Sequence, residues 1–214
     1  MKPFPLLALG LAASLALAGC KIVKNEPEGE KAIAADASGD DARTAQRIAD
    51  TFESKLLPLV NDTALPLPDL RKALAGGLDA AGKAHGNRGA GAGAAWNFAV
   101  KGEGKVVSAK LDSRARWIGL DTDGDNQQDV TVQLGPVIKG SAMRDIAAFY
   151  NFDDFRDQIE FAKLGRAIND ELSKRISVPD GDLTGRTVRF TGVVPLKKAD
   201  EEFTVTPSKI EVLP

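Results

Sequence analysis

The hydrophobic period of this chain changes once, at a connector of glycine and alanine, and this change limits the folds that the chain can adopt. Before the connector, apolar residues recur at every fourth position, as at Phe52 and Leu56, which is typical of a helix with one buried face. Beyond residues 86–95, apolar and polar residues alternate, beginning at Trp96 and Phe98, as in strands of a half-buried sheet. The sequence therefore predicts a helical region followed by a mostly β domain.

The helical region is expected to cover residues 42–85 as a hairpin of two helices. Asp40 or Asp41 can cap the start of the first helix, and Pro68 suits the first turn of the second. Pro58 weakens the end of the first helix, because proline lacks a backbone donor and crowds the preceding turn.

The β domain is expected to contain three or four strands, one helix and then two further strands. The helix begins at Asp153 or Asp154, since acidic side chains favour the N-terminal end of a helix dipole. Turns are predicted at Gly102-Glu103-Gly104 and across Asp121–Asp129. Alternating apolar residues place the strands at residues 96–100, 107–111, 115–120, 130–134, 188–194 and 203–213.

This order of elements predicts an α+β fold. It consists of an N-terminal helical hairpin followed by an OB-like five-stranded β-barrel over residues 96–214, with a helix between strands 3 and 4. That helix would close one end of the barrel. A small meandering sheet with a packed helix fits the same order and is the alternative.

Cys20 is the only cysteine, and it follows Lys2 and an apolar stretch from Leu6 to Leu17. A basic start, about a dozen apolar residues and small residues before a cleavage site are typical of an export signal. The run Leu17-Ala18-Gly19-Cys20 resembles a bacterial lipobox. The resemblance implies that residues 1–19 are removed and that the Cys20 thiol is acylated, so that the lipid bilayer is a partner. The alternative is a plain secretory signal with a cysteine at its end.

Residues 20–41 contain few apolar side chains, which predicts a flexible tether between the lipid and the domain. Lys21 follows the lipidated cysteine. In proteobacterial sorting, which this arrangement resembles, Asp at that position keeps a lipoprotein in the inner membrane. We therefore expect the periplasmic side of the envelope, with the outer membrane favoured over the inner one.

Charge and residue types exclude several classes of function. Lys2 is the only charged residue of the signal, so 27 basic and 30 acidic residues remain after its removal, which leaves no basic footprint for nucleic acid. A single histidine, His85, beside a flexible connector provides no Cys–His pair and no His/Cys zinc set. We expect no enzyme. The alternative is a glycosidase-like carboxylate pair from Asp153, Asp154 and Glu160.

A run of carboxylates separates two expected strands. Alternating Asp oxygens can converge on one calcium ion, which binds six to eight oxygen ligands. The match to an EF-hand loop is partial, because Gly124 precedes the third Asp and Val132 occupies the twelfth position. A hydrogen-bonded turn without metal explains the same residues. The candidate calcium ligands are Asp121, Asp123, Asp125 and Asp129.

The segment from Gly135 to Ala162 is rich in aromatic residues. It contains Gly135-Pro136-Val137-Ile138, Gly140, Arg144-Asp145, Phe152, Phe155 and Gln158-Ile159-Glu160. This combination resembles the signature of a family of predicted periplasmic lipoproteins of unknown function, whose genes are often found beside those of ribose-type sugar ABC transporters. Asp157 stands where the family pattern has Asn. The resemblance implies a membrane-tethered accessory of carbohydrate uptake with an OB-like body, and it carries over no catalytic residue.

Two sets of residues are candidates for a binding surface. Arginine beside aromatic residues is a common composition of binding hot spots, although core packing explains an aromatic cluster equally well. The first set, at the edge of a ligand or partner surface, is Arg144, Asp145, Tyr150 and Asn151. The second, which offers aromatic faces to a sugar, is Trp96, Trp117 and Tyr150.

The leading hypothesis is therefore a membrane-anchored, non-enzymatic binding or interaction lipoprotein. Its partner would be a component of a sugar ABC transporter or a small carbohydrate, and nucleic acid is excluded as a partner. One alternative is a module that binds carbohydrate directly. Another is a structural lipoprotein of the envelope stapled by calcium, and no other cofactor is expected.

Overall fold

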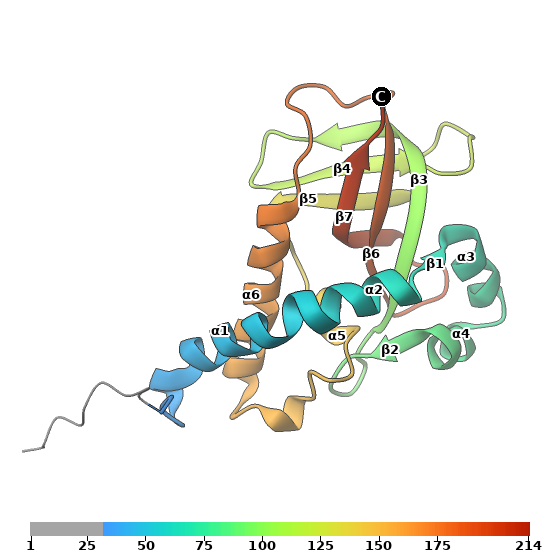
Figure 1. Ribbon diagram of the computed structural model, residues 1–214. Helices are drawn as coiled ribbons and strands as arrows, with labels where there is room; N and C mark the ends of the chain where they lie inside the picture. Colours follow the sequence, from blue (N-terminus) through green and yellow to red (C-terminus); the bar gives the residue numbers. More distant parts are fainter. Residues whose placement is uncertain (1–31) are drawn as a thin grey trace, which may run out of the picture. The chain divides into compact units, whose positions relative to one another are not determined.

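Five strands close into a β-barrel in the computed structural model, which describes residues 32–214 (Figure 1). The order around the barrel is β3-β4-β5-β7-β6, and β6 pairs back with β3. The pairing of β5 with β7 is parallel, and the other barrel pairings are antiparallel. The strands are β3 (Trp96–Lys110), β4 (Ala115–Asp121), β5 (Val130–Pro136), β6 (Thr187–Leu196) and β7 (Phe203–Val212).

Helix α6 (Gln158–Arg175) connects β5 to β6, as the sequence predicts for the helix between strands 3 and 4. The OB-like barrel is thereby confirmed. Leu164, Ile168 and Leu172 recur along one face of α6 and are fully buried. The helix begins later than expected: Asp157 caps it by accepting the backbone N–H groups of residues 159 and 160, each at 2.9 Å. Asp153 and Asp154 instead belong to a short 3-10 helix, η3 (Phe152–Asp154).

Strand β3 runs without interruption through the turn predicted at Gly102-Glu103-Gly104, so that prediction is wrong. Its first ten residues pair with β6, and its last six follow β4 with one residue, Val107, left unpaired at a register shift. The glycines permit close approach instead of a turn. A Cβ atom at Gly102 would lie 2.8 Å from Cδ1 of Leu67, and one at Gly104 would lie 2.5 Å from the carbonyl oxygen of Asp121.

The N-terminal region is helical, as predicted, but Pro58 does not end its first helix. Three consecutive segments form one long helix: α1 (Asp40–Thr51), the π-helix η2 (Phe52–Leu56) and α2 (Leu57–Thr63). In the π-turn the N–H of Leu57 donates to the carbonyl of Phe52, five residues back. This wider turn makes room for the Pro58 ring, which would crowd the carbonyl of an ordinary α-helical turn.

The α1 part of the long helix packs on α6, and its α2 part packs on β3 and β6. Figure 1 shows the long helix and α6 crossing beside the barrel. The next helices pack on each other and on β3, so α1 finds its main partner in α6. These next two helices are α3 (Leu67–Ala75) and α4 (Leu78–His85). A short strand precedes them, β1 (Leu65–Pro66), and another follows them within the predicted Gly/Ala connector, β2 (Gly86–Arg88). Two further short helices are η1 (Ala37–Gly39) and α5 (Ala142–Asp145). Residues 33–214 form one compact unit.

A cluster of charged side chains joins the start of α1 to the start of α6. The buried carboxylate of Asp40 accepts from Arg43 at 2.7 Å and from Arg156 at 3.0 Å, and Lys163 lies 3.6 Å away. Glu160, equally buried, accepts from Arg43 at 2.7 Å. The Arg156 hydrogen bond lowers the pKa of Asp40, and the Arg43 hydrogen bond lowers the pKa of Glu160. These charges are therefore used to fasten the two helices.

Candidate functional site

The outer face of β4, β5 and β7 sets an aromatic side chain among polar ones. Trp117 on β4 lies opposite Gln133 on β5, and Thr131 lies opposite Thr204 on β7. Side chains alternate along a strand, so their neighbours point inward. Three of these neighbours are fully buried in the barrel: Ile118, Val132 and Val205.

Arg116 lies beside Trp117 where the β4–β5 pairing changes register. Arg116 lies opposite Gly135, whereas Trp117 lies opposite Gln133, so the β4–β5 pairing shifts by one residue between them. The extra residue, Leu134, lies in β5, so the bulge disturbs the β5 strand opposite Arg116 and Trp117. Arg116 and Trp117 are both half-buried, and both line the same two hollows on the outside of the barrel.

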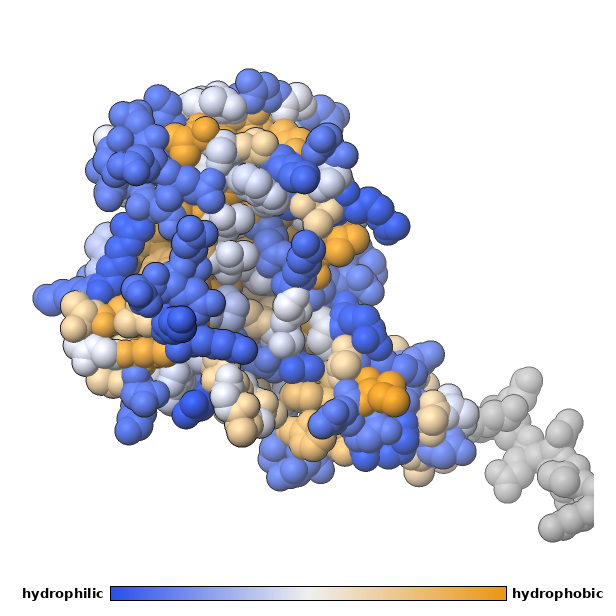
Figure 2. Space-filling model, turned by 180° about the vertical axis from the view of Figure 1, so that it is seen from behind, coloured by the Kyte–Doolittle hydropathy of each residue, from blue (hydrophilic) through white to orange (hydrophobic). Residues whose placement is uncertain are grey.

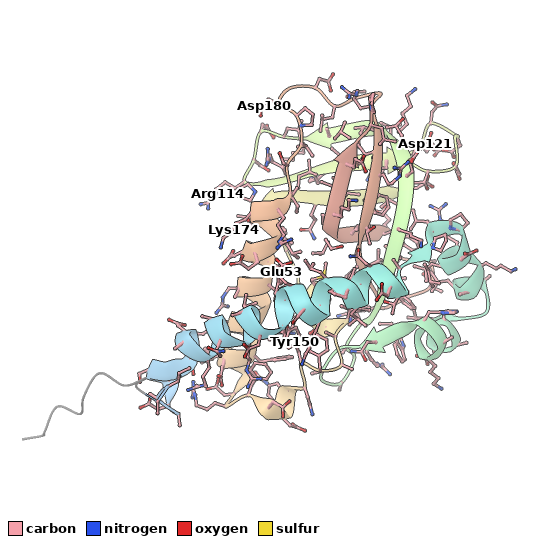
Figure 3. All side chains as sticks on the ribbon, in the orientation of Figure 1. Glu53, Arg114, Asp121, Tyr150, Lys174 and Asp180 are labelled. Atoms are coloured by element: carbon pink, nitrogen blue, oxygen red, sulfur yellow. The ribbon has the colours of Figure 1, made fainter. Side chains whose placement is uncertain are left out.

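The two hollows differ in size and in charge. The smaller, of about 320 Å³, lies over β4, β5 and β7, and its polar lining includes Thr131, Gln133, Lys139, Thr204 and Thr206. The larger, of about 840 Å³, lies between the β3–β4 turn and the loop after α6, and its polar lining includes Lys110, Asp112, Asp180, Asp182 and Thr184. Figure 3 shows Asp180 and Arg114 on one side of the barrel and Asp121 on the other.

Gln133 fixes the floor of the smaller hollow. Its amide nitrogen donates to the carbonyl of Lys139 and to the hydroxyl of Thr206, both at 3.1 Å. Its amide oxygen accepts the backbone N–H of Lys139 at 2.7 Å. The loop that carries Lys139 is thus tied to the barrel wall, and the lining is held in place before any ligand arrives.

The first predicted surface is largely taken up by internal contacts. The Arg144 guanidinium lies 3.6 Å from the centre of the Phe161 ring, donates to the carbonyl of Phe161 at 3.0 Å and pairs with Asp145 at 2.6 Å. Tyr150 is 6% exposed, and its hydroxyl lies 2.6 Å from that of Thr51. Burial raises the pKa of Tyr150. Figure 3 shows Tyr150 beneath the long helix, and the exposed Asn151 caps η3.

The second predicted set is not brought together. Trp96 donates from its indole nitrogen to Asp79 at 2.9 Å. Its ring packs so closely on α4 that a Cβ atom at Gly82 would lie 2.2 Å from it. Trp96 lines a different hollow from the two beside Trp117, and Tyr150 is buried. Of the three aromatic residues, Trp117 alone lies on the face just described.

The family model described as "Predicted periplasmic lipoprotein (DUF2291)" matches residues 10–211, nearly the whole chain. The chain belongs to this family of predicted periplasmic lipoproteins. The matched region includes Cys20, and membership supports a lipid-anchored location in the periplasm. No curated protein matches the chain. No helix within residues 32–214 is long and apolar enough to span a bilayer.

A crystal structure of an OB-fold protein from Thermotoga maritima is similar in fold. The match has a TM-score of 0.52 and 17% sequence identity, and it covers 80% of this chain and 95% of that one. At this identity the likeness supports the OB architecture alone. The predicted membership of a family of periplasmic lipoproteins is therefore confirmed, as is the fold, whereas an association with sugar transporters is not shown.

The Gly135–Gly140 part of the segment that resembles the family pattern connects the end of β5 to α6 through hydrogen bonds. Gly135 and Gly140 adopt φ values of 69° and 88°, which side chains rarely tolerate. The loop between them is held by Asn169 of α6, whose amide donates to the carbonyls of Ile138 at 3.2 Å and Gly140 at 2.8 Å. In this lipoprotein the segment therefore positions α6, and it also carries Lys139 to the rim of the smaller hollow.

The Asp-rich loop is organised by its own backbone. Asp121 is 6% exposed, and its two oxygens accept the N–H groups of residues 123, 124 and 126 at 2.7–3.2 Å. The hydrogen bond from Gly124 is the main cause of a lowered pKa at Asp121. Asp129 accepts from Thr122 at 2.6 Å and pairs with Arg71 at 3.1 Å.

Carboxylate oxygens of Asp121, Asp123 and Asp129 lie within 4.8 Å of one another, whereas Asp125 is not part of this group. Asp125 accepts from Gln127, and Arg71 already supplies a positive charge to Asp129. The hydrogen bonds fit a turn that holds its shape through Asp side chains.

The carboxylates proposed for a glycosidase pair also have other contacts. Glu160 is buried in ion pairs with the start of α1, and Asp153 and Asp154 are exposed in η3. The predicted lipidation site, Cys20, and most of the tether lie outside the described residues, and His85 is exposed at the end of α4. Sequence reasoning missed Arg116, Lys139 and Gln133. The alternating polar positions of β5, Thr131 and Gln133, were the signal that could have found them.

Proposed function

We propose that this chain is a lipid-anchored periplasmic binding module without catalytic activity, and that it binds its ligand or partner at the outer face of β4, β5 and β7. The observation that carries the proposal is the position of Trp117, half-buried between two hollows on a rigid barrel wall. This face of an OB barrel is suited to recognising extended or ring-shaped ligands. Family membership supports the periplasmic, lipid-anchored setting.

The character of the surface favours a small or polar binding partner. Viewed from behind, the molecule is mostly hydrophilic or near-neutral, and its hydrophobic residues form small separate areas (Figure 2). Large, permanent protein interfaces are more apolar than this. A Trp ring with hydroxyl and amide groups around it can instead stack on one face of a ligand while polar groups fix its orientation.

Site-specific crosslinking in native membranes tests the location of the binding face. A photoreactive residue at position 117 is expected to capture a defined ligand or partner. The same residue at Gln46, exposed on α1, serves as the control. Equal recovery of bulk envelope proteins from both positions would contradict a binding role for the Trp117 face.

The anchor has its own test. Cys20→Ser is expected to move the protein from the membrane fraction to the soluble fraction without a change in melting temperature, because the thiol holds only the lipid. A variant that still sediments fully with membranes would overturn the lipoprotein assignment for this chain. Separation of the two membranes by density then tests the placement favoured by Lys21, which is the outer membrane.

A role beside a sugar ABC transporter is the more specific form of this proposal, and it rests on the family resemblance alone. Direct carbohydrate binding is the second candidate, favoured by the three threonines that line the hollow beside Trp117. Capture of transporter subunits from position 117 supports the first. Quenching of Trp117 fluorescence by monosaccharides, with Trp96→Phe as the background, supports the second.

Calcium binding remains the third candidate, with Asp121, Asp123 and Asp129 as the ligands in reach of one another. It requires that calcium raise the melting temperature and that Asp123→Ala abolish the rise. The hydrogen-bonded turn predicts the same melting temperature with calcium and with chelator. Thermal unfolding under both conditions therefore decides between a metal staple and a self-sufficient loop.

A further inference from the structure

We infer that the smaller hollow beside Trp117 binds a small polyhydroxylated anion, a compound with several hydroxyl groups and a carboxylate or phosphate. This inference rests on the proposed function, since it names the ligand class of the same face. It begins from the charged side chains that line the hollow. They are two cations, Arg116 and Lys139, and no acidic residue of the described chain is among them.

Both cations are available to a ligand. The Nε–H of Arg116 donates to the carbonyl of Gly135 at 2.9 Å, which orients the guanidinium and leaves its two terminal nitrogens. Lys139 is held through its backbone by Gln133, at 2.7 Å and 3.1 Å. Neither cation forms an ion pair with any residue between positions 32 and 214, whereas Arg144, with the same functional group, is paired and stacked. A planar guanidinium and a nearby ammonium are well suited to bind one oxyanion.

The two hollows on either side of Trp117 differ in the charges that line them. The larger hollow shares Arg116 and adds Lys110, but it is also lined by three carboxylates, those of Asp112, Asp180 and Asp182. An anion would be repelled by these carboxylates and attracted to the other side of the indole ring. The charge pattern therefore directs an anionic group to the smaller hollow, in a chain whose formal net charge is −2.

The remaining lining is suited to hydroxyl groups. Thr204 is exposed at the hollow, and Thr131 accepts from Gln128 at 2.9 Å, so that its own hydroxyl proton can still be donated. The Trp117 ring supplies an apolar face of the kind that packs against the C–H groups of a sugar ring. A volume of about 320 Å³ lies at the lower end of the range for small-molecule sites, which suits a ligand of one ring.

Calorimetric titration of the full lipidated chain in detergent tests the inference with three probes: D-glucuronate, D-glucose 6-phosphate and D-glucose. At low salt we expect at least one anionic probe to bind at least about tenfold more tightly than glucose, because a charge-assisted hydrogen bond contributes about that factor. The tighter of the two anions identifies the ligand as a carboxylate or a phosphate. Arg116→Gln and Lys139→Gln should each weaken that anion about tenfold and weaken glucose by a smaller factor, so that the preference for the anion falls.

Lys72→Gln, which removes the same charge from an exposed position on α3, is the control and should change nothing. Equal affinities for glucose and both anions, anion binding unaffected by the two variants, or no binding of any probe would each overturn the inference. The proposed function is judged separately, by whether crosslinking from position 117 captures a defined partner or ligand. Failure of the anion preference alone therefore leaves the Trp117 face as the binding site of another ligand class.

Discussion

Charged and aromatic residues gather in two regions of this lipoprotein, and the two regions use them in opposite ways. Where α1 crosses α6, Arg43 pairs with Asp40 on its own helix and with Glu160 on α6. On the outer barrel face, Arg116 and Lys139 form no ion pair with any residue of the described chain and line an open hollow. Paired charges are used to hold the fold, whereas oriented and unpaired charges on a rigid wall are available for recognition.

The same contrast separates the two arginine–aromatic pairs. Arg144 lies against the Phe161 ring, its hydrogen bonds are satisfied, and its side chain is 11% exposed. Arg116 lies next to Trp117 at a register shift and keeps two nitrogens for a ligand. Composition alone does not distinguish these pairs, so a variant of each is needed to establish which one stabilises the protein and which one binds.

The largest expected effect is on the stability of α6. Leu164→Ala removes a fully buried side chain from the helix that packs against α5 and the barrel. We expect a loss of about 2–5 kcal/mol in the free energy of unfolding, from lost burial and the cavity that remains. Urea denaturation measures it. Thr204→Ala, on the exposed binding face, should stay within about 0.5 kcal/mol of the wild type.

The second prediction compares alanine variants of the two arginines. Arg144→Ala should lower the free energy of unfolding by about 1.5–3 kcal/mol, because it removes hydrogen bonds of a charged group within the fold. Arg116→Ala should leave stability within about 1 kcal/mol and weaken ligand binding instead. Thermal unfolding and binding measured on the same samples compare the two. An Arg116 variant that unfolds more readily than the Arg144 variant would contradict this division.

The sequence contains enough information to predict the barrel, because the order of alternating and helical segments leaves few possible topologies. It did not predict that β3 is continuous, since Gly102 and Gly104 are typical of turns until the close contacts with Leu67 and Asp121 are known. Nor did it identify α6 as the partner of the first helix. That contact joins residues more than a hundred positions apart, as in the pairing of Arg43 with Glu160.

The candidate site was only partly predictable, for a similar reason. Trp117 stood out by residue type, but the sequence could not tell it from Trp96, whose indole is engaged by Asp79. Arg116 lines the hollow beside a register shift between β4 and β5 that no local pattern reveals. The aromatic segment around Tyr150 stood out more strongly than the binding face. In the folded chain most of the aromatic side chains of this segment are buried, so they pack in the core.

The third prediction uses pH to separate the regions. Hydrogen bonds from Arg43 and Arg156 lower the pKa of Glu160 and Asp40 below their ordinary values, near 4 in unfolded chains. The stabilisation is therefore complete above pH about 5 and is lost as the pH falls through the lowered values. The melting temperature should fall steeply below pH about 4, and less steeply in Glu160→Gln. Asp62→Asn, an exposed change on α2, should follow the wild-type curve.

The smallest expected effect concerns Tyr150, which the sequence placed at a binding surface. Tyr150→Phe removes only the hydroxyl that lies 2.6 Å from Thr51, so it should cost about 0.5–1.5 kcal/mol of stability. Because Tyr150 is buried beneath the long helix, ligand affinity at the Trp117 face should not change. Thr51→Val provides the matched control, since it removes the partner of the same hydrogen bond. Loss of ligand binding in Tyr150→Phe at unchanged stability would instead show that recognition extends to the aromatic segment and that the barrel face is not the whole site.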